Sequence, residues 1–156
     1  MEADKKISKL RSLCQLDIDA IGTYDAALSR IDVPLLKEKL TEFRADHVRH
    51  VSALNDLLVK LGSQTVSDKA DLKGAVLKGF TSITSRLGNE AALMAMVGNE
   101  ELTTRTYHSA LQMQWSADER ELIERHYADE RRHLDWIKEA ARNRQQWSPR
   151  ETQAHP

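Results

Sequence analysis

Apolar residues recur at alternating steps of three and four along most of the chain, which is the spacing of one face of an α-helix. Four such stripes run from Ile7 to Ile31, from Leu36 to Leu61, from Leu93 to Leu111 and from Ile123 to Ala140. The sequence therefore predicts four long amphipathic helices that share one core. The residues expected to be buried along its axis are Ile7, Leu10, Ile21, Leu28, Leu40, Leu54, Leu57, Leu111 and Ile137.

Turn and cap residues separate the four stripes. Asp32-Val33-Pro34 supplies a turn with an N-cap before the second helix, and Gly62 suits the position just after its last turn. Asn89 and Ser116 are residue types that cap the third and fourth helices. Residues 63–88 carry a weaker helical pattern, so we expect a long crossover there with a helix of its own.

The two halves of the chain repeat one another at a fixed offset. Asp17 and Glu100 lie 83 positions apart, and so do His50 and His133 (133 − 50 = 83). The same offset relates Tyr24 to Tyr107, Ala27 to Ala110, Asp46 to Asp129 and Arg49 to Arg132. Because one offset serves both helices of each pair, the repeated unit is a helical hairpin. Two copies predict a four-helix bundle with a pseudo-twofold axis.

Composition agrees with one all-α domain. The 156 residues are 40% hydrophobic and only 5% aromatic, with six Gly and three Pro. We expect this domain over residues 1–145 and a flexible polar tail over 146–156. The net charge of −1 gives no general attraction to nucleic acid or membranes, and we find no apolar signal core or span. A lone Cys14 favours a reducing compartment, so a cytoplasmic location is expected.

Six polar residues occupy stripe positions that the bundle should bury. A buried charge is strongly unfavourable unless it is neutralised or coordinated, so these positions need a chemical explanation. At a rise of ~1.5 Å per residue, those of the first hairpin lie about 20 to 24 Å from its turn, and those of the second about 21 to 26 Å from theirs. Both sets therefore converge on one layer. The six are Asp17, His47, His50, Glu100, Glu130 and His133.

These residues have the chemistry of a metal site. Glu130-Arg131-Arg132-His133 places a carboxylate and an imidazole on one helix face, within reach of a single ion. Di-iron carboxylate bundles combine one Glu from each of two helices with a Glu-x-x-His pair from each of the other two. Glu100 and the fourth helix match this pattern. Asp17 replaces the Glu of the first helix, and His47 replaces the first Glu of the second helix's pair, so both changes weaken bridging between two ions.

The segments around these residues resemble the ferritin-like superfamily, in particular rubrerythrin-type domains and a bacterial ferritin-like family of unassigned function. The resembling stretches, 16–24, 43–50, 99–107 and 128–133, cover all four principal helices. The resemblance implies a ferritin-like four-helix bundle with a di-iron or related dinuclear site, and chemistry on dioxygen or peroxide. The electron-delivering part of a rubrerythrin needs four cysteines, whereas this chain has one.

Two carboxylates beside the layer have roles that the sequence leaves open. Asp46 lies four residues before His50 and is the alternative ligand of the second helix, but it lies off the stripe, so His47 is preferred. Asp46 and Asp129 can also orient ligand histidines from outside the layer. A solvated helix edge explains both carboxylates equally well.

Three ring side chains also lie close to the layer. Tyr24 and Tyr107 lie two turns from the carboxylates of their own helices, and helical side chains lean toward the N-terminus, so their hydroxyls can point back at a ligand carboxylate. His126 lies one turn before Glu130. It can pack in the core, support a ligand or act as a further ligand, with packing preferred.

Two functional hypotheses follow. The leading one is a non-haem metal-binding protein that holds one or two ions, iron by preference and manganese or zinc as alternatives. It would act on dioxygen or peroxide as an oxidase, ferroxidase or peroxide-reducing oxidoreductase. The other is a non-catalytic, stress-associated scaffold or interaction module that binds one metal or none. We expect a homodimer and no nucleic-acid or membrane partner, while the electron donor stays open.

Overall fold

The computed structural model describes residues 2–67 and 88–143. Within these ranges it contains four α-helices and no strand: α1 (Glu2–Leu28), α2 (Pro34–Lys60), α4 (Asn89–Ala110) and α5 (Ala117–Arg142). Residues 2–67 and 88–143 are therefore all-α, as the sequence predicts, and consistent with a four-helix bundle. Most of the predicted crossover and the whole C-terminal tail fall outside the described residues.

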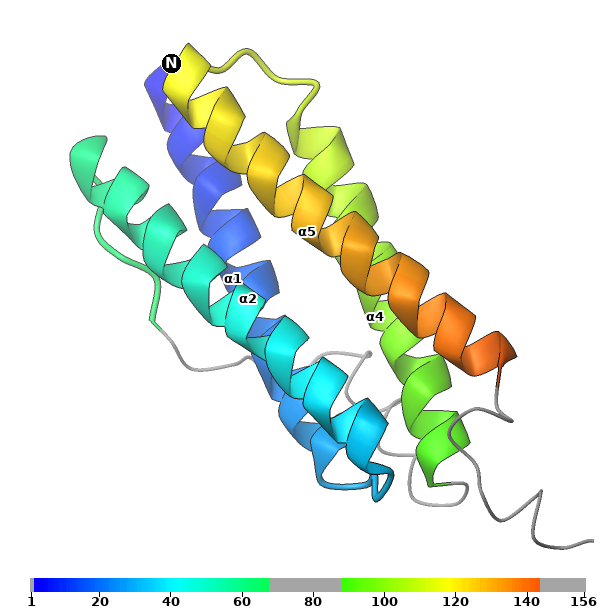
Figure 1. Ribbon diagram of the computed structural model, residues 1–156. Coiled ribbons are helices and arrows are strands. Elements are labelled where there is room, and N and C mark those ends of the chain that lie inside the picture. Colours follow the sequence, from blue (N-terminus) through cyan, green and yellow to red (C-terminus); the bar gives the residue numbers. More distant parts are fainter. Residues whose placement is uncertain (1, 68–87, 144–156) are drawn as a thin grey trace, which may run out of the picture.

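The four helices form two antiparallel hairpins, α1 with α2 and α4 with α5, whose turns lie at opposite ends of the bundle (Figure 1). Contacts are most extensive within each hairpin, and α1 also packs along α4. The offset found in the sequence relates the starts of the second helices, α2 at Pro34 and α5 at Ala117 (117 − 34 = 83), whereas α1 and α4 begin 87 positions apart (89 − 2 = 87). The two hairpins are thus laid out alike.

Two predicted helix ends are confirmed. The hydroxyl of Ser116 accepts the backbone N–H of Glu119, and the carboxylate of Glu119 accepts the N–H of Ser116, which is the reciprocal capping box. Gly62 follows α2 with φ of 83°, and its N–H donates to the carbonyl of Val59 at 3.0 Å. Glycine reaches this left-handed conformation without strain, so it ends the helix where expected.

Two other predicted caps are wrong. α2 follows Val33 and α4 follows Gly88, and neither residue makes a side-chain cap. Asp32 and Asn89 bind each other instead: Asn89 Nδ2 donates to Asp32 Oδ1 at 2.7 Å, and the Asp32 N–H donates to Asn89 Oδ1 at 3.0 Å. The two side chains therefore join the first turn of the bundle to the start of α4.

The apolar core consists of two clusters, one on each side of a polar layer along every helix. Leu10, Leu40, Leu54 and Ile137 are buried as predicted. Five predicted core residues are only partly buried, namely Ile7, Ile21, Leu28, Leu57 and Leu111. They pack at the cluster edges because the buried face lies about one position away, as at Leu58.

The first helix is shorter than its stripe. α1 ends at Leu28, so Ile31 lies in the turn, where it is nevertheless 3% exposed. The outward faces of all four helices carry charged residues. None of the helices in the described ranges combines the length and the apolar character that a membrane span requires.

Two adjacent leucines at the start of α2 test this core. Leu36 is 0% exposed, whereas Leu35 is 44% exposed. Leu36→Ala leaves a cavity, so we expect it to lower the free energy of unfolding by ~2–5 kcal/mol. Leu35→Ala should cost no more than about 0.5 kcal/mol, because the side chain lies at the surface. Urea unfolding followed by circular dichroism measures both, and equal losses would contradict the assigned core.

Candidate metal centre

Midway along the bundle, all four helices direct polar side chains at one another. Among the described residues, two overlapping groups of four have ligand-type atoms within 4.8 Å of one another. All members of these groups are at most 1% exposed. The first group is Asp17, His47, His50 and Glu130, and the second is His47, Glu100, Glu130 and His133. The structure thus brings together all six residues that the sequence singles out.

Helix geometry explains this convergence. α2 and α5 each present two of the residues three positions apart, which places both side chains of a pair on one face. α1 and α4 each present one carboxylate at the same level. His47 and Glu130 belong to both groups, and they are duplicate positions (130 − 47 = 83). The centre therefore has the form of two half-sites that share two side chains.

His47 contacts the carboxylates of three other helices. Its Nδ1 lies 2.6 Å from Asp17 Oδ1 and its Nε2 lies 3.0 Å from Glu100 Oε1. The Nδ1 atom also lies 3.5 Å from Glu130 Oε1. Burial opposes protonation of the imidazole, but the carboxylates of Glu130 and Glu100 outweigh it and hold the pKa of His47 well above 6.5. A protonated His47 thus neutralises part of the buried negative charge.

Each of the two tyrosines reaches across to the other hairpin. The Tyr24 hydroxyl donates to Glu100 Oε1 at 2.5 Å, and the Tyr107 hydroxyl donates to Asp17 Oδ2. Burial, reinforced by these carboxylates, raises the pKa of both phenols well above 10, so they act as neutral donors. The expected contact to the carboxylates exists, and it runs between α1 and α4 rather than within either helix.

The two outer carboxylates bind the two outer histidines in the same crossed manner. His133 Nε2 lies 2.7 Å from Asp46 Oδ2, and His50 Nε2 lies 2.9 Å from Asp129 Oδ2. Asp46 is 6% exposed and contacts His133, so of the two roles that the sequence leaves open, the structure agrees with orienting a histidine rather than with a solvated helix edge. Asp46 belongs to neither group of ligand atoms. Carboxylates placed in this way orient a histidine ring and leave its other nitrogen for a metal.

These contacts also set the charge of the outer histidines. Burial opposes protonation of His50, but Asp129 and Asp17 raise its pKa to about 10. The same balance, with Asp46 and Glu100 as the carboxylates, raises the pKa of His133 to about 9. A metal ion binds neutral imidazole, so metal binding at neutral pH has to displace protons from both rings.

The rings that cover these histidines differ between the two halves. Phe43 stacks on His133 with centroids 4.4 Å apart, and His126 stacks on His50 at 3.8 Å. Phe43 and His126 are duplicate positions (126 − 43 = 83). His126 Nδ1 lies 3.1 Å from the Tyr107 hydroxyl, and burial lowers the pKa of His126 to about 3. His126 belongs to neither ligand group, so its observed role is packing plus a contact to Tyr107.

Thr103 belongs to the layer, although the sequence pattern does not identify it. Its hydroxyl oxygen lies 3.0 Å from Glu100 Oε2 and 2.9 Å from Glu130 Oε2, and the residue is fully buried. Steps of four and three from Glu100 to Tyr107 pass through Thr104 and so miss the buried face by one position. The available signal is spacing, because Thr103 follows Glu100 by three residues, as His133 follows Glu130.

Two atoms at the centre have no hydrogen-bond partner within the described part of the chain. They are Oε1 of Glu130 and Nδ1 of His133, from the two residues of the Glu-x-x-His pair. Burial raises the pKa of Glu130, because the charged form is poorly solvated there. Unsatisfied buried donor and acceptor atoms call for a missing partner, and a cation between a carboxylate and an imidazole supplies one.

The profile of one protein family matches residues 5–113 of the chain. The chain belongs to the family described as Domain of unknown function (DUF2383). The DUF2383 match covers α1, α2 and α4 and ends before α5, the helix that carries Glu130 and His133. No curated protein matches the chain. The DUF2383 description names no metal, substrate or activity, so a functional proposal has to start from the site.

Proposed function

We propose that this DUF2383 chain is a ferritin-like, non-haem iron-binding protein with oxidase, ferroxidase or peroxide-reducing activity. The observation that carries the proposal is the pair of overlapping ligand groups, buried at the centre and drawn from four helices. Two antiparallel hairpins have their turns at opposite ends (Figure 1). Together with ligand-type side chains that converge from all four helices, they support the ferritin-like assignment.

The donor set fits iron. Three carboxylates and three imidazoles suit iron, and also manganese or zinc, whereas calcium and magnesium prefer oxygen ligands alone. Asp17, Glu100 and Glu130 would balance the charge of an oxidised ion, and His50 and His133 would fix its position. Bound iron would supply one-electron redox chemistry toward dioxygen or peroxide. The protein's own groups hold the ligands in place through Asp46 and Asp129 and keep the layer dry.

His47 favours one ion over two. It occupies the position at which the di-iron pattern has a Glu, between both ligand groups. An imidazole there removes one negative charge and one carboxylate that can bridge two cations. We therefore propose that the site binds a single iron, or binds a second one more weakly.

A specific observation also supports the non-catalytic alternative. His47, Tyr24 and Tyr107 already donate to the buried carboxylates of Asp17 and Glu100. The carboxylates of Asp17 and Glu100 thus have hydrogen-bond partners without a metal cation, as a structural scaffold requires. In that case the bundle would bind one ion, such as zinc, or none, and would carry out no reaction.

Anaerobic titration with Fe(II), combined with elemental analysis, separates these functions. The iron proposal predicts at least one tightly bound iron per chain and an absorbance change when dioxygen or peroxide is added. Tight zinc binding without any oxidation of added Fe(II) would favour the scaffold. A chain that binds neither metal at micromolar concentrations would overturn the metal-binding proposal altogether.

A further inference from the structure

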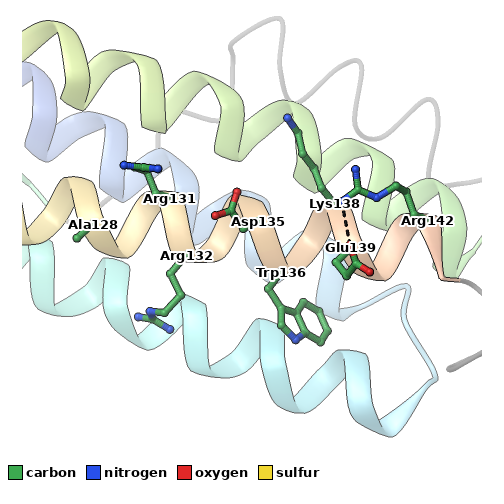
Figure 2. A pocket seen from close by; sticks show the side chains of 8 residues that line it. All are labelled: Ala128, Arg131, Arg132, Asp135, Trp136, Lys138, Glu139 and Arg142. Carbon is green, nitrogen blue, oxygen red and sulfur yellow. Dashed lines mark hydrogen bonds and ion pairs between the residues drawn. The ribbon is translucent and has the colours of Figure 1, made fainter.

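The two halves of the bundle differ in the wall that separates the polar layer from solvent. On the His133 side, Phe43 covers the imidazole, and Trp136 packs edge-on against Phe43 with centroids 5.8 Å apart. Figure 2 shows the indole of Trp136 reaching from α5 toward α2. Two aromatic rings, one behind the other, therefore separate His133 from the surface pocket of about 850 Å³ that Trp136 lines, and this side is called the closed side.

The His50 side has only one such ring. His126 stacks on His50, and the same His126 lines a surface pocket of about 470 Å³. Ala53 lines this pocket too, and it is the duplicate of Trp136 (136 − 53 = 83). Where the closed side has an indole, the open side has a methyl group. The open side therefore has no counterpart of the Trp136 ring, and the pocket lies beside Ala53, the residue at the duplicate position.

The pocket is also lined by Asp129, the carboxylate that contacts His50. Asp129 accepts from His50 Nε2, and its side chain is 25% exposed. His126 itself is 6% exposed and forms the inner end. A molecule in the pocket is therefore one imidazole away from a residue of the first ligand group.

The remaining lining indicates what the pocket accepts. Arg49 and Arg125 line the pocket together with the carboxylate of Asp129. Arg49 also pairs with Asp46, and Nη1 of Arg125 lies 3.9 Å from Glu121 Oε1. Guanidinium groups offer hydrogen-bond donors and no acceptor, so this lining suits a small neutral or anionic molecule better than a metal cation. Hydrogen peroxide and azide are molecules of that class.

We propose that the pocket lined by Ala53 and His126, here called the Ala53 pocket, is the approach by which a small neutral or anionic molecule reaches the metal centre. The inference rests on the proposed metal site. Passage requires one imidazole, that of His126, to swing aside. Passage on the opposite side requires both Phe43 and Trp136 to leave their packed positions, which a close-packed interior resists.

Ala53→Trp tests the proposal, because it copies the closed side onto the open one. Azide binding to the iron-loaded, oxidised protein is followed by stopped-flow absorbance. We expect Ala53→Trp to slow azide binding about tenfold or more, which corresponds to a barrier higher by ~1.4 kcal/mol, with the iron content unchanged. Ala53→Leu fills the same space with a smaller group and serves if the indole prevents folding.

Trp136→Ala is the matched control on the closed side, and it should leave the azide rate unchanged or raise it. An unchanged rate in both Ala53 variants, or a slower rate in Trp136→Ala, would overturn the proposal. A slower uptake of Co(II) with unchanged azide binding would also overturn it, because the pocket would then admit cations.

Modification of the metal-free protein separates this inference from the metal proposal. Diethyl pyrocarbonate should modify His126 more slowly in Ala53→Trp than in the unchanged chain, while the exposed His108 serves as internal reference. Peptide mass spectrometry reads both sites. If the chain binds no iron, the metal proposal fails. Slower modification of His126 in Ala53→Trp would still support the pocket as the approach to the layer. Equal modification in both proteins would overturn the pocket proposal whatever the metal content.

Discussion

Glu130→Ala is expected to abolish iron binding or to weaken it by more than about 100-fold, because changes to residues that merely orient ligands already cost 10 to 100-fold. Glu130 is a member of both ligand groups, so its removal damages both half-sites. Its Oε1 atom accepts no hydrogen bond among the described residues, and it lies 3.3 Å from Nδ1 of His50 and 3.5 Å from Nδ1 of His47, so this oxygen and these two ring nitrogens face the same space. Isothermal titration calorimetry under anaerobic conditions, with elemental analysis, measures the loss.

The chain offers controls for this prediction. Glu101→Ala removes a carboxylate of the same length beside Glu100, but its side chain is 46% exposed, so iron affinity should stay unchanged. His133→Ala removes a member of the second group only, which tells whether the bound ion lies in that group. Circular dichroism establishes that each variant folds. An iron affinity in folded Glu130→Ala equal to that of the unchanged protein would exclude this centre as the metal site.

His47→Glu is expected to raise the ratio of iron to protein toward two. The substitution restores the carboxylate of the di-iron pattern at the position shared by both ligand groups. It also supplies the negative charge that balances a second cation. Elemental analysis after anaerobic loading and desalting gives the ratio directly.

The same variant should be less stable without metal. His47 now lies 2.6 Å from an oxygen of Asp17 and 3.0 Å from one of Glu100, and its pKa is held well above 6.5. A carboxylate in its place adds like charge to both, and breaking a buried ion pair of this kind costs about 3–5 kcal/mol. The metal-free variant should therefore unfold at a lower temperature. Iron should raise this temperature again, because it binds the folded state.

His47→Gln is the control, since it removes the imidazole without adding a carboxylate. It should lose stability in the metal-free state but keep a ratio no higher than that of the unchanged protein. A ratio that rises equally in His47→Gln and His47→Glu would show that the imidazole merely blocks the second ion. A ratio that stays the same in both would contradict the role assigned to His47.

The level and the face of the site residues followed from the sequence alone. A helix rises by a constant step and turns by a constant angle, so counting from Pro34 and Ser116 places His50 and His133 at one height. The repeat adds an independent constraint, because the same offset that relates Asp17 to Glu100 relates the histidines as well. The four helices and their convergent polar positions could therefore be predicted, and the structure brings those positions together.

The same reasoning has a tolerance of about one position, because neighbouring residues on a helix differ by only ~100° in direction. Steps of three and four therefore predict Leu57 in the core, where Leu58 is buried, and pass through Thr104, where Thr103 is buried. Asp46 lies one position from the stripe residue His47, so the sequence left open whether it lies at a solvated edge, and in the structure it is 6% exposed and contacts His133. Helix periodicity indicates a face, and packing against neighbours decides which residues of that face are covered.

Which side chains meet across the bundle was decided only by the tertiary structure. Tyr24 bonds to Glu100 and Tyr107 to Asp17, contacts between residues 76 and 90 positions apart that no local spacing encodes. The aromatic wall beside the centre also depends on a contact between distant residues, because Trp136 on α5 packs on Phe43 of α2. The residue types were visible in the sequence. Their partners depend on how two helices face each other, which is set by packing along their whole length and not by the residues near any one position.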